Sequence, residues 1–314
     1  MRKWSGGWLT APVAVLIVVL AMPAAVAGQT VYERGRPPGP GAKTWLAERD
    51  KLPPFSPPRT SDGHPDLQGR WDGTGNGDSV EETEYIDLTT PPWESRVSSP
   101  VDGKLPYQPW ALAARDAHRA GLARGWPGET GEALYLDPQT FCVKTVPRYA
   151  QRSFELVYTP GHVVIMLNWG HVHRSIPIDG GSHPSPNAKF WMGSPRGHWE
   201  GDTLVVEVTN LNGKMWLDSA GNFYSENARV IERFQLAGAN IMDYEATIED
   251  PTVFTQPVTL SYEIQRTATG GGSGMPDPYA SETWEYACHE GNAHHIVEAH
   301  RLGFKWYKGA VRPD

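Results

Sequence analysis

A short segment near the C-terminus concentrates side chains that could do chemistry. Within Tyr286–His295, ten residues hold one of the two cysteines of the chain, three histidines and one glutamate. Imidazole and carboxylate groups act as general bases, general acids or metal ligands, whereas a cysteine can anchor a segment covalently. The pattern indicates a site, with His289 and Glu290 as its candidate catalytic pair. It does not indicate a substrate.

A second histidine pattern is His171-Val172-His173. Side chains at positions i and i+2 of a strand share one face, so both imidazoles could reach one divalent ion, Zn or Ca. A third ligand is required, and His289, Glu290 or His183 could supply it. The alternative is a pair of solvent-facing histidines at a strand edge. The chain contains neither a His-Glu-x-x-His nor a Cys-x-x-Cys motif, so metalloprotease and zinc-ribbon sites lack support.

Three further candidates follow the histidine pair. Arg174 could stabilise an anionic leaving group or pair with Asp179, which belongs to an Asp-Gly-Gly sequence typical of a turn. His183 lies beyond that turn, where a position at a cleft is the alternative to the core. Glu200 and Asp202 are most simply explained by a hairpin turn at Gly201-Asp202. Glycine patterns for nucleotides and a Gly-x-Ser-x-Gly elbow are missing from the sequence, so no nucleotide cofactor is expected.

The N-terminus has the three-part pattern of a secretory signal. Arg2 and Lys3 precede an apolar run and then Ala25-Val26-Ala27, which predicts a signal peptide over residues 1–27 and a mature chain from Gly28. An uncleaved anchor is less favoured because prolines break the short apolar run. The formal charge is 28 − 36 = −8 for the chain and 26 − 36 = −10 after cleavage. A secreted or periplasmic acidic protein is a poor partner for nucleic acid or anionic membranes, and no membrane span is expected after cleavage.

Only two cysteines, Cys142 and Cys288, are present in a chain predicted to enter an oxidising compartment. A disulfide between them is therefore expected, with a free catalytic cysteine as the alternative. Such a bond would tie the His-rich segment to the middle of the fold. Cys288 is then a structural anchor, which leaves His289 and Glu290 as the chemical part of the segment.

The secondary-structure elements that would position these candidates can be predicted from the composition, which differs between the N-terminal region and the rest of the chain. Residues 28–108 are dense in Pro and Gly and predict an extended N-terminal arm that wraps a β-rich body, residues 109–314. One helix is predicted over Pro109–Ala120, between a proline at its start and Gly121 at its end, with His118 on its solvated face. Alternating apolar runs beyond residue 153 predict many antiparallel strands, hence an all-β barrel or sandwich, with a lipocalin-like barrel favoured. The expected strands are Phe154–Tyr158, His162–Trp169, Val172–Ile178, Thr203–Thr209, Arg229–Leu236, Ile241–Ile248, Val258–Arg266 and Glu282–Ala287.

Several blocks of the chain resemble a widespread family of exported bacterial β-rich proteins, most of them without an assigned function. The blocks are Arg59–Trp71, Trp199–Val206, Trp216–Phe234, Cys142–Arg148 and Tyr286–Asn292. The resemblance implies cleavage of lignin-type aryl ether dimers outside the cytoplasm without glutathione. It favours Arg174, Asp179, His183, His289 and Glu290 as site residues. The chain departs from the family pattern after Asn292, where Ala293 stands in place of an aromatic residue.

Three functions therefore compete. The first is a secreted enzyme that cleaves an ether bond in a lignin-derived aromatic compound by His and Glu acid-base chemistry, with or without a divalent metal. The second is a lipocalin-like protein that binds a hydrophobic aromatic or terpenoid ligand. The third, a glycoside-active enzyme, depends only on the carboxylates and on the 13 Trp and 12 Tyr residues. A small aromatic molecule is the expected partner, and the oligomeric state is left open.

Overall fold

The computed structural model describes residues 39–73, 79–82, 94–121, 135–167, 170, 172–178, 180–266 and 287–310. The chain divides into two compact units, residues 1–34 and 35–314, and every described residue belongs to the second. The predicted signal peptide lies outside the described residues. Within the described part of the chain, all helices are too short or too polar to cross a membrane.

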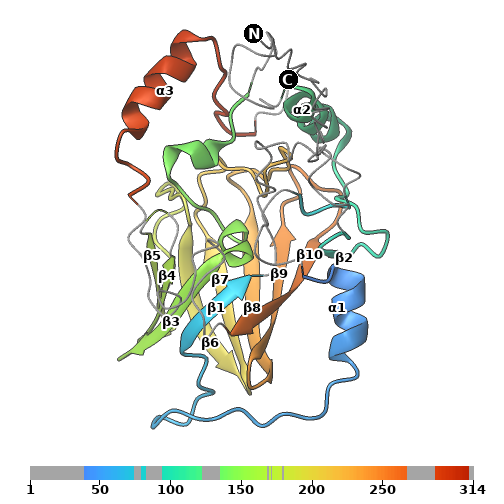
Figure 1. Ribbon diagram of the computed structural model, residues 1–314, viewed down its shortest axis with the longest axis vertical. Helices are drawn as coiled ribbons and strands as arrows, with labels where there is room; N and C mark the ends of the chain where they lie inside the picture. Colours follow the sequence, from blue (N-terminus) through green and yellow to red (C-terminus); the bar gives the residue numbers. More distant parts are fainter. Residues whose placement is uncertain are drawn as a thin grey trace, which may run out of the picture. The chain divides into compact units, whose positions relative to one another are not determined.

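The described strands form one antiparallel sheet that curls into a nearly closed barrel (Figure 1). Nine of them follow the order β5-β4-β3-β1-β10-β9-β8-β7-β6, and β2 pairs with β10 beside this path. The two ends of the order meet, because a Cβ placed on Gly197 of β6 would lie 3.0 Å from Cγ2 of Ile176 on β5. The predicted all-β barrel is thus confirmed. The strands are β1 Gly69–Gly73, β2 Val97–Ser99, β3 Ser153–Thr159, β4 His162–Leu167, β5 His173–Pro177, β6 Ser194–Glu200, β7 Thr203–Thr209, β8 Arg229–Gly238, β9 Ile241–Glu249 and β10 Val258–Arg266.

Alternating residues of the strands fill the barrel interior. On β9, Met242, Tyr244, Ala246 and Ile248 are fully buried, whereas the residues between them are partly exposed. Because side chains alternate across a strand, this pattern sends one set inward and the other toward solvent. Phe234 of β8 pairs with Tyr244, and their rings lie 4.9 Å apart. Large side chains therefore occupy the interior of the barrel.

In the described part of the chain, three α-helices and two short 3-10 helices accompany the barrel, where one helix was predicted. The predicted helix is found with its predicted bounds, since Pro109 suits a first helical turn and Gly121 caps the end. α2 and α3 lie at the same end of the strands, whereas α1 lies beside β10 (Figure 1). The α-helices are α1 Ala42–Arg49, α2 Pro109–Ala120 and α3 Asn292–Arg301, and the 3-10 helices are η1 Pro138–Phe141 and η2 Arg148–Gln151.

Two strands come from the Pro- and Gly-rich region that was predicted as an extended arm. β1 lies between β3 and β10 in the sheet, and β2 pairs with β10. Trp71 of β1 is fully buried, and its indole N–H donates to the Leu67 carbonyl over 2.8 Å. The guanidinium of Arg266 lies 4.2 Å from the centre of the same ring. Trp71 therefore inserts into the sheet as a core residue.

Candidate functional site

Arg174, a predicted site residue, lies inside the barrel. It forms an ion pair with Glu232 of β8, and both side chains are almost wholly buried. Tyr149 accepts a hydrogen bond from Arg174 over 3.0 Å, and Tyr149 and Tyr244 donate to Glu232 over 2.7 and 2.8 Å. Burial opposes the charge on Arg174, but the carboxylate of Glu232 raises the pKa of the guanidinium above its usual value. Asp179, the partner suggested by the sequence, lies outside the described residues.

His183 lies on the outer side of the barrel. Its Nε2 is 3.5 Å from a carboxylate oxygen of Glu207, which projects from β7 between the buried residues Val206 and Val208. Neighbouring positions on a strand face opposite sides, so Glu207 points away from the interior that Arg174 occupies. In the part of the chain that the structure describes, the buried Nδ1 atom of His183 has no hydrogen-bond partner. His183 and Arg174 therefore belong to different faces of the sheet.

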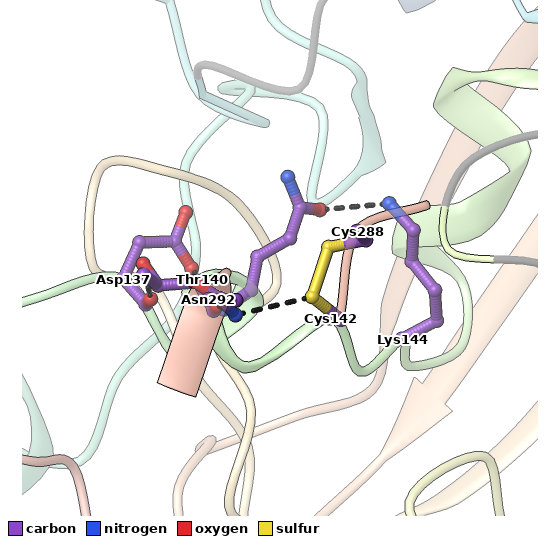
Figure 2. Close-up of a disulfide and its surroundings, with 7 residues drawn as sticks. Asp137, Thr140, Cys142, Lys144, Cys288 and Asn292 are labelled. Atoms are coloured by element: carbon purple, nitrogen blue, oxygen red, sulfur yellow. Dashed lines mark hydrogen bonds between the residues drawn. A yellow bond between two sulfur atoms is a disulfide. The ribbon is translucent and has the colours of Figure 1, made fainter. Parts of the chain in front are cut away.

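His289 and Glu290 follow the predicted disulfide, which the structure confirms. Cys142 and Cys288 are bonded, and the Asn292 side chain donates to Sγ of Cys142 over 3.2 Å and to the Thr140 carbonyl over 2.7 Å (Figure 2). Both His289 and Glu290 are exposed in the turn before α3. Glu290 borders a hollow of about 450 Å³ next to the disulfide, whose described walls do not include His289. The disulfide thus anchors α3 to η1.

The predicted metal ligands are only partly described. His171 lies outside the described residues, and His173 is exposed on β5, on the side of the strand opposite to Arg174. Across the residues that the structure describes, no three His, Cys, Asp or Glu side chains come together as a metal site requires. The predicted His171, His173 and His289 set stays a prediction.

The described members of the predicted site occupy three places. Arg174 is inside the barrel, His183 is on its outer face, and His289 with Glu290 is at the start of α3. General acid-base catalysis requires its groups to reach the same reacting atoms. These four residues therefore do not form one constellation.

A different cavity, of about 520 Å³, opens between α2 and the C-terminal segment. Six aromatic residues from four parts of the chain line it. They are Trp110, Tyr135, Phe223, Phe304, Trp306 and Tyr307. The volume and the wall are typical of a site for a small organic molecule, for which cavities of about 300–1,000 Å³ are usual.

His118 of α2 is the polar residue at the inner wall of this cavity. The sequence placed it on a solvated helix face, but it is only 8% exposed, because the Tyr135, Phe223 and Tyr307 rings pack around it at 5.1–5.4 Å. Its Nδ1 lies 3.3 Å from the Gly221 carbonyl oxygen, which can only accept, so Nδ1 carries the proton and Nε2 is left as an acceptor. Nε2 has no partner among the described residues. Burial lowers the pKa of this imidazole, so the neutral form dominates at pH 7.

Sequence reasoning could have found His118 from helix periodicity. Ala111, Ala114 and His118 are spaced by three and four residues and therefore share one face of α2. Ala111 is fully buried and Ala114 lines the cavity. A histidine on the face that also carries small apolar residues is directed toward the protein.

Cations and an unpaired hydroxyl complete the cavity. Lys305 and Lys308 line it and are exposed to solvent. The hydroxyl of Tyr307 is buried without a hydrogen-bond partner among the described residues, and burial raises its pKa well above the usual value. The described wall of the cavity therefore combines six aromatic residues, the neutral imidazole of His118, a second histidine (His300), one buried hydroxyl and two ammonium groups.

Comparison of this chain with family models, with curated proteins and with solved structures finds no match.

Proposed function

We propose that the protein binds a small aromatic molecule in the cavity between α2 and the C-terminal segment. The observation that carries the proposal is the set of six aromatic residues around about 520 Å³. Aromatic rings pack favourably against one another in stacked or edge-to-face arrangements, which contribute about 0.5–1.5 kcal/mol beyond burial of area. In this proposal the ligand lies at one end of the barrel, since side chains such as Phe234 and Tyr244 fill the interior.

A second candidate function, cleavage of an aryl ether, is favoured by His118. Its unpartnered Nε2 can take the proton of a substrate hydroxyl next to the ether-bearing carbon. The hydroxyl oxygen then bonds to that carbon, the ether C–O bond breaks, and the phenolate leaves with the bonding electrons. Lys305 or Lys308 stabilises the phenolate, which takes a proton from the imidazolium to give an epoxide and a phenol. In this proposal His118 replaces His289 and His183 as the base.

The proposed setting is outside the cytoplasm. The signal-like N-terminus and the Cys142–Cys288 disulfide support export, since disulfides persist in oxidising compartments. N-terminal sequencing of exported protein should begin at Gly28.

Calorimetric titration tests binding. We expect a guaiacyl-type aryl ether dimer to bind the wild type, and Trp306→Ala to weaken the affinity about tenfold because Trp306 lines the cavity. Trp191→Ala is the matched control, since Trp191 is an exposed tryptophan that does not line the cavity. A wild type that binds no aromatic ligand would overturn the proposal.

Mass spectrometry of the same mixtures separates binding from turnover. If the ether is cleaved, His118→Leu should lower the rate at least about a hundredfold, the usual contribution of a general base. His183→Leu, on the outer face of the barrel, should leave the rate unchanged. An intact dimer after incubation with wild-type protein leaves the binding function and rejects the enzymatic one.

A further inference from the structure

The charged side chains described on the cavity wall are all basic, although the chain as a whole is acidic. The chain has 36 acidic and 28 basic residues. The described residues that line the cavity nevertheless include two lysines and no aspartate or glutamate. A cationic rim next to a low-dielectric wall attracts anions and raises their local concentration.

Both lysines lack a carboxylate partner in the described part of the chain. Lys305 is positioned by its backbone, which bridges to Tyr135 and accepts from the Leu136 N–H over 3.4 Å, and its Nζ lies 5.9 Å from the centre of the Tyr135 ring. Some other cations on this barrel form ion pairs with carboxylates. Arg229, for example, forms ion pairs with Glu207 and Glu249, both at 2.8 Å. Lys305 and Lys308 thus remain available to a ligand.

The buried imidazole of His118 selects a different group of the ligand than the lysines do. His118 presents an acceptor, Nε2, because its Nδ1–H is engaged by the Gly221 carbonyl. A ligand group that reaches Nε2 must therefore donate a hydrogen bond. Aromatic rings line the same cavity as the buried imidazole and the exposed lysines.

On the basis of the proposed function, we infer that the ligand is a phenolic aromatic carboxylate. Its carboxylate lies at Lys305 and Lys308, its ring lies between the aromatic walls, and its phenolic O–H donates to Nε2 of His118. Three features of the cavity then find their complements: ammonium with carboxylate, ring with ring, and acceptor with hydroxyl. A neutral aromatic compound would leave the lysines unused, and an aromatic acid without a hydroxyl would leave Nε2 unused.

Calorimetry with three related probes tests this inference: 4-hydroxybenzoate, its methyl ester and benzoate. For the wild type, 4-hydroxybenzoate should bind about tenfold more tightly than either of the others, because the ester lacks the charge and benzoate lacks the donor. The preference over the ester should disappear in the Lys305→Met/Lys308→Met variant. It should persist in Lys43→Met/Lys51→Met, which makes the same change of net charge on exposed lysines at α1.

The preference for the hydroxyl is tested separately. His118→Leu should bind 4-hydroxybenzoate and benzoate with equal affinity. If this variant does not fold, the wild-type ranking of the three probes still decides the matter. Equal binding of acid and ester by the wild type would overturn the inference and leave the proposed aromatic site intact. Failure of all three probes and of the aryl ether dimer would overturn the proposed function itself.

Discussion

Arg174 on β5 and Glu232 on β8 place two opposite charges in the apolar interior of the barrel. Separating buried charges from water costs several kcal/mol for each ion, and the cost is recovered only where both partners are present with additional hydrogen bonds. Here Tyr149 and Tyr244 supply these bonds to Glu232. Arg174 is thus committed to a structural pair, which is why it is not assigned to a leaving group.

We expect Glu232→Gln to lower the free energy of unfolding by about 3–5 kcal/mol, because it leaves the Arg174 charge buried without a counter-ion. Denaturant titration measures the change. The matched control is Glu200→Gln, which removes an exposed ion pair with Arg233 of the same strand β8 and should cost about 1 kcal/mol or less.

The double variant Arg174→Met/Glu232→Leu sharpens this test. It removes both charges and should be more stable than Glu232→Gln alone. Equal stability losses for Glu232→Gln and Glu200→Gln would show that the buried pair has no special role.

At the scale of elements, the cavity depends on how the C-terminal segment is held. Eight of the thirteen lining residues lie between His300 and Ala310, after the Cys288 anchor and α3. The disulfide attaches this segment to η1, 146 residues away in the sequence. Closing so long a loop restricts the unfolded chain and stabilises the fold by about 2–5 kcal/mol in the chain-entropy account.

We therefore expect Cys142→Ala/Cys288→Ala to lose about 2–5 kcal/mol of unfolding free energy and to bind 4-hydroxybenzoate more weakly. Denaturant titration and calorimetry give the two values. Wild-type protein treated with a reductant should behave like the double variant, whereas the variant itself should not respond to the reductant. Unchanged affinity in the double variant would show that the segment holds its place without the disulfide.

At the scale of the whole molecule, pH acts on folding through a buried lysine. Lys144 is 2% exposed and donates to the side chain of Gln139 over 3.0 Å. Burial, reinforced by the nearby charges of Arg148 and Arg152, lowers its pKa to about 6. Unfolding returns the lysine to a pKa near 10.4, so the unfolded chain binds more protons than the native one between these two values.

The free energy of unfolding should therefore rise with pH from about 6 toward 10, and the contribution of Lys144 should be lost as pH falls toward 6. Between pH 6 and 9 the wild type should gain up to about 4 kcal/mol more than Lys144→Met, at about 1.36 kcal/mol per pH unit. Chemical denaturation at a series of pH values gives the slopes. Lys189→Met, at an exposed lysine, should keep the wild-type slope. Parallel slopes for the wild type and Lys144→Met would contradict the shift.

Much of the fold could be predicted from local signals in the sequence, namely apolar runs, turn residues and residues that begin or end a helix. The bounds of α2 follow from Pro109 and Gly121, and those of β7 and β10 follow from apolar runs between turn residues. The hairpin at Gly201-Asp202 joins β6 to β7, as predicted from its turn residues. The pairing of two lone cysteines also required only the expectation of an oxidising compartment.

Other features arise from contacts between residues far apart in the sequence. β1 and β2 come from a region whose prolines and glycines indicate loops, and β6 carries Pro195 and Gly197, which hide its strand pattern. Gly197 is explained by the close approach of Ile176 across the barrel seam. The strand conformation at such positions depends on contacts with residues far away in the sequence, so local propensity does not predict it.

In the candidate site, too, some features could be predicted from the sequence and others depend on long-range contacts. The types of reactive residue, the acidic charge, the disulfide and the β-rich body all follow from the sequence alone, because composition and local periodicity determine them. Which residues meet was decided only by tertiary packing: Arg174 with Glu232 inside the barrel, His183 with Glu207 outside it, and His118 with aromatic rings from distant segments. The physical reason is that burial and electrostatic environment belong to the folded surroundings of a side chain, and these are assembled by long-range contacts.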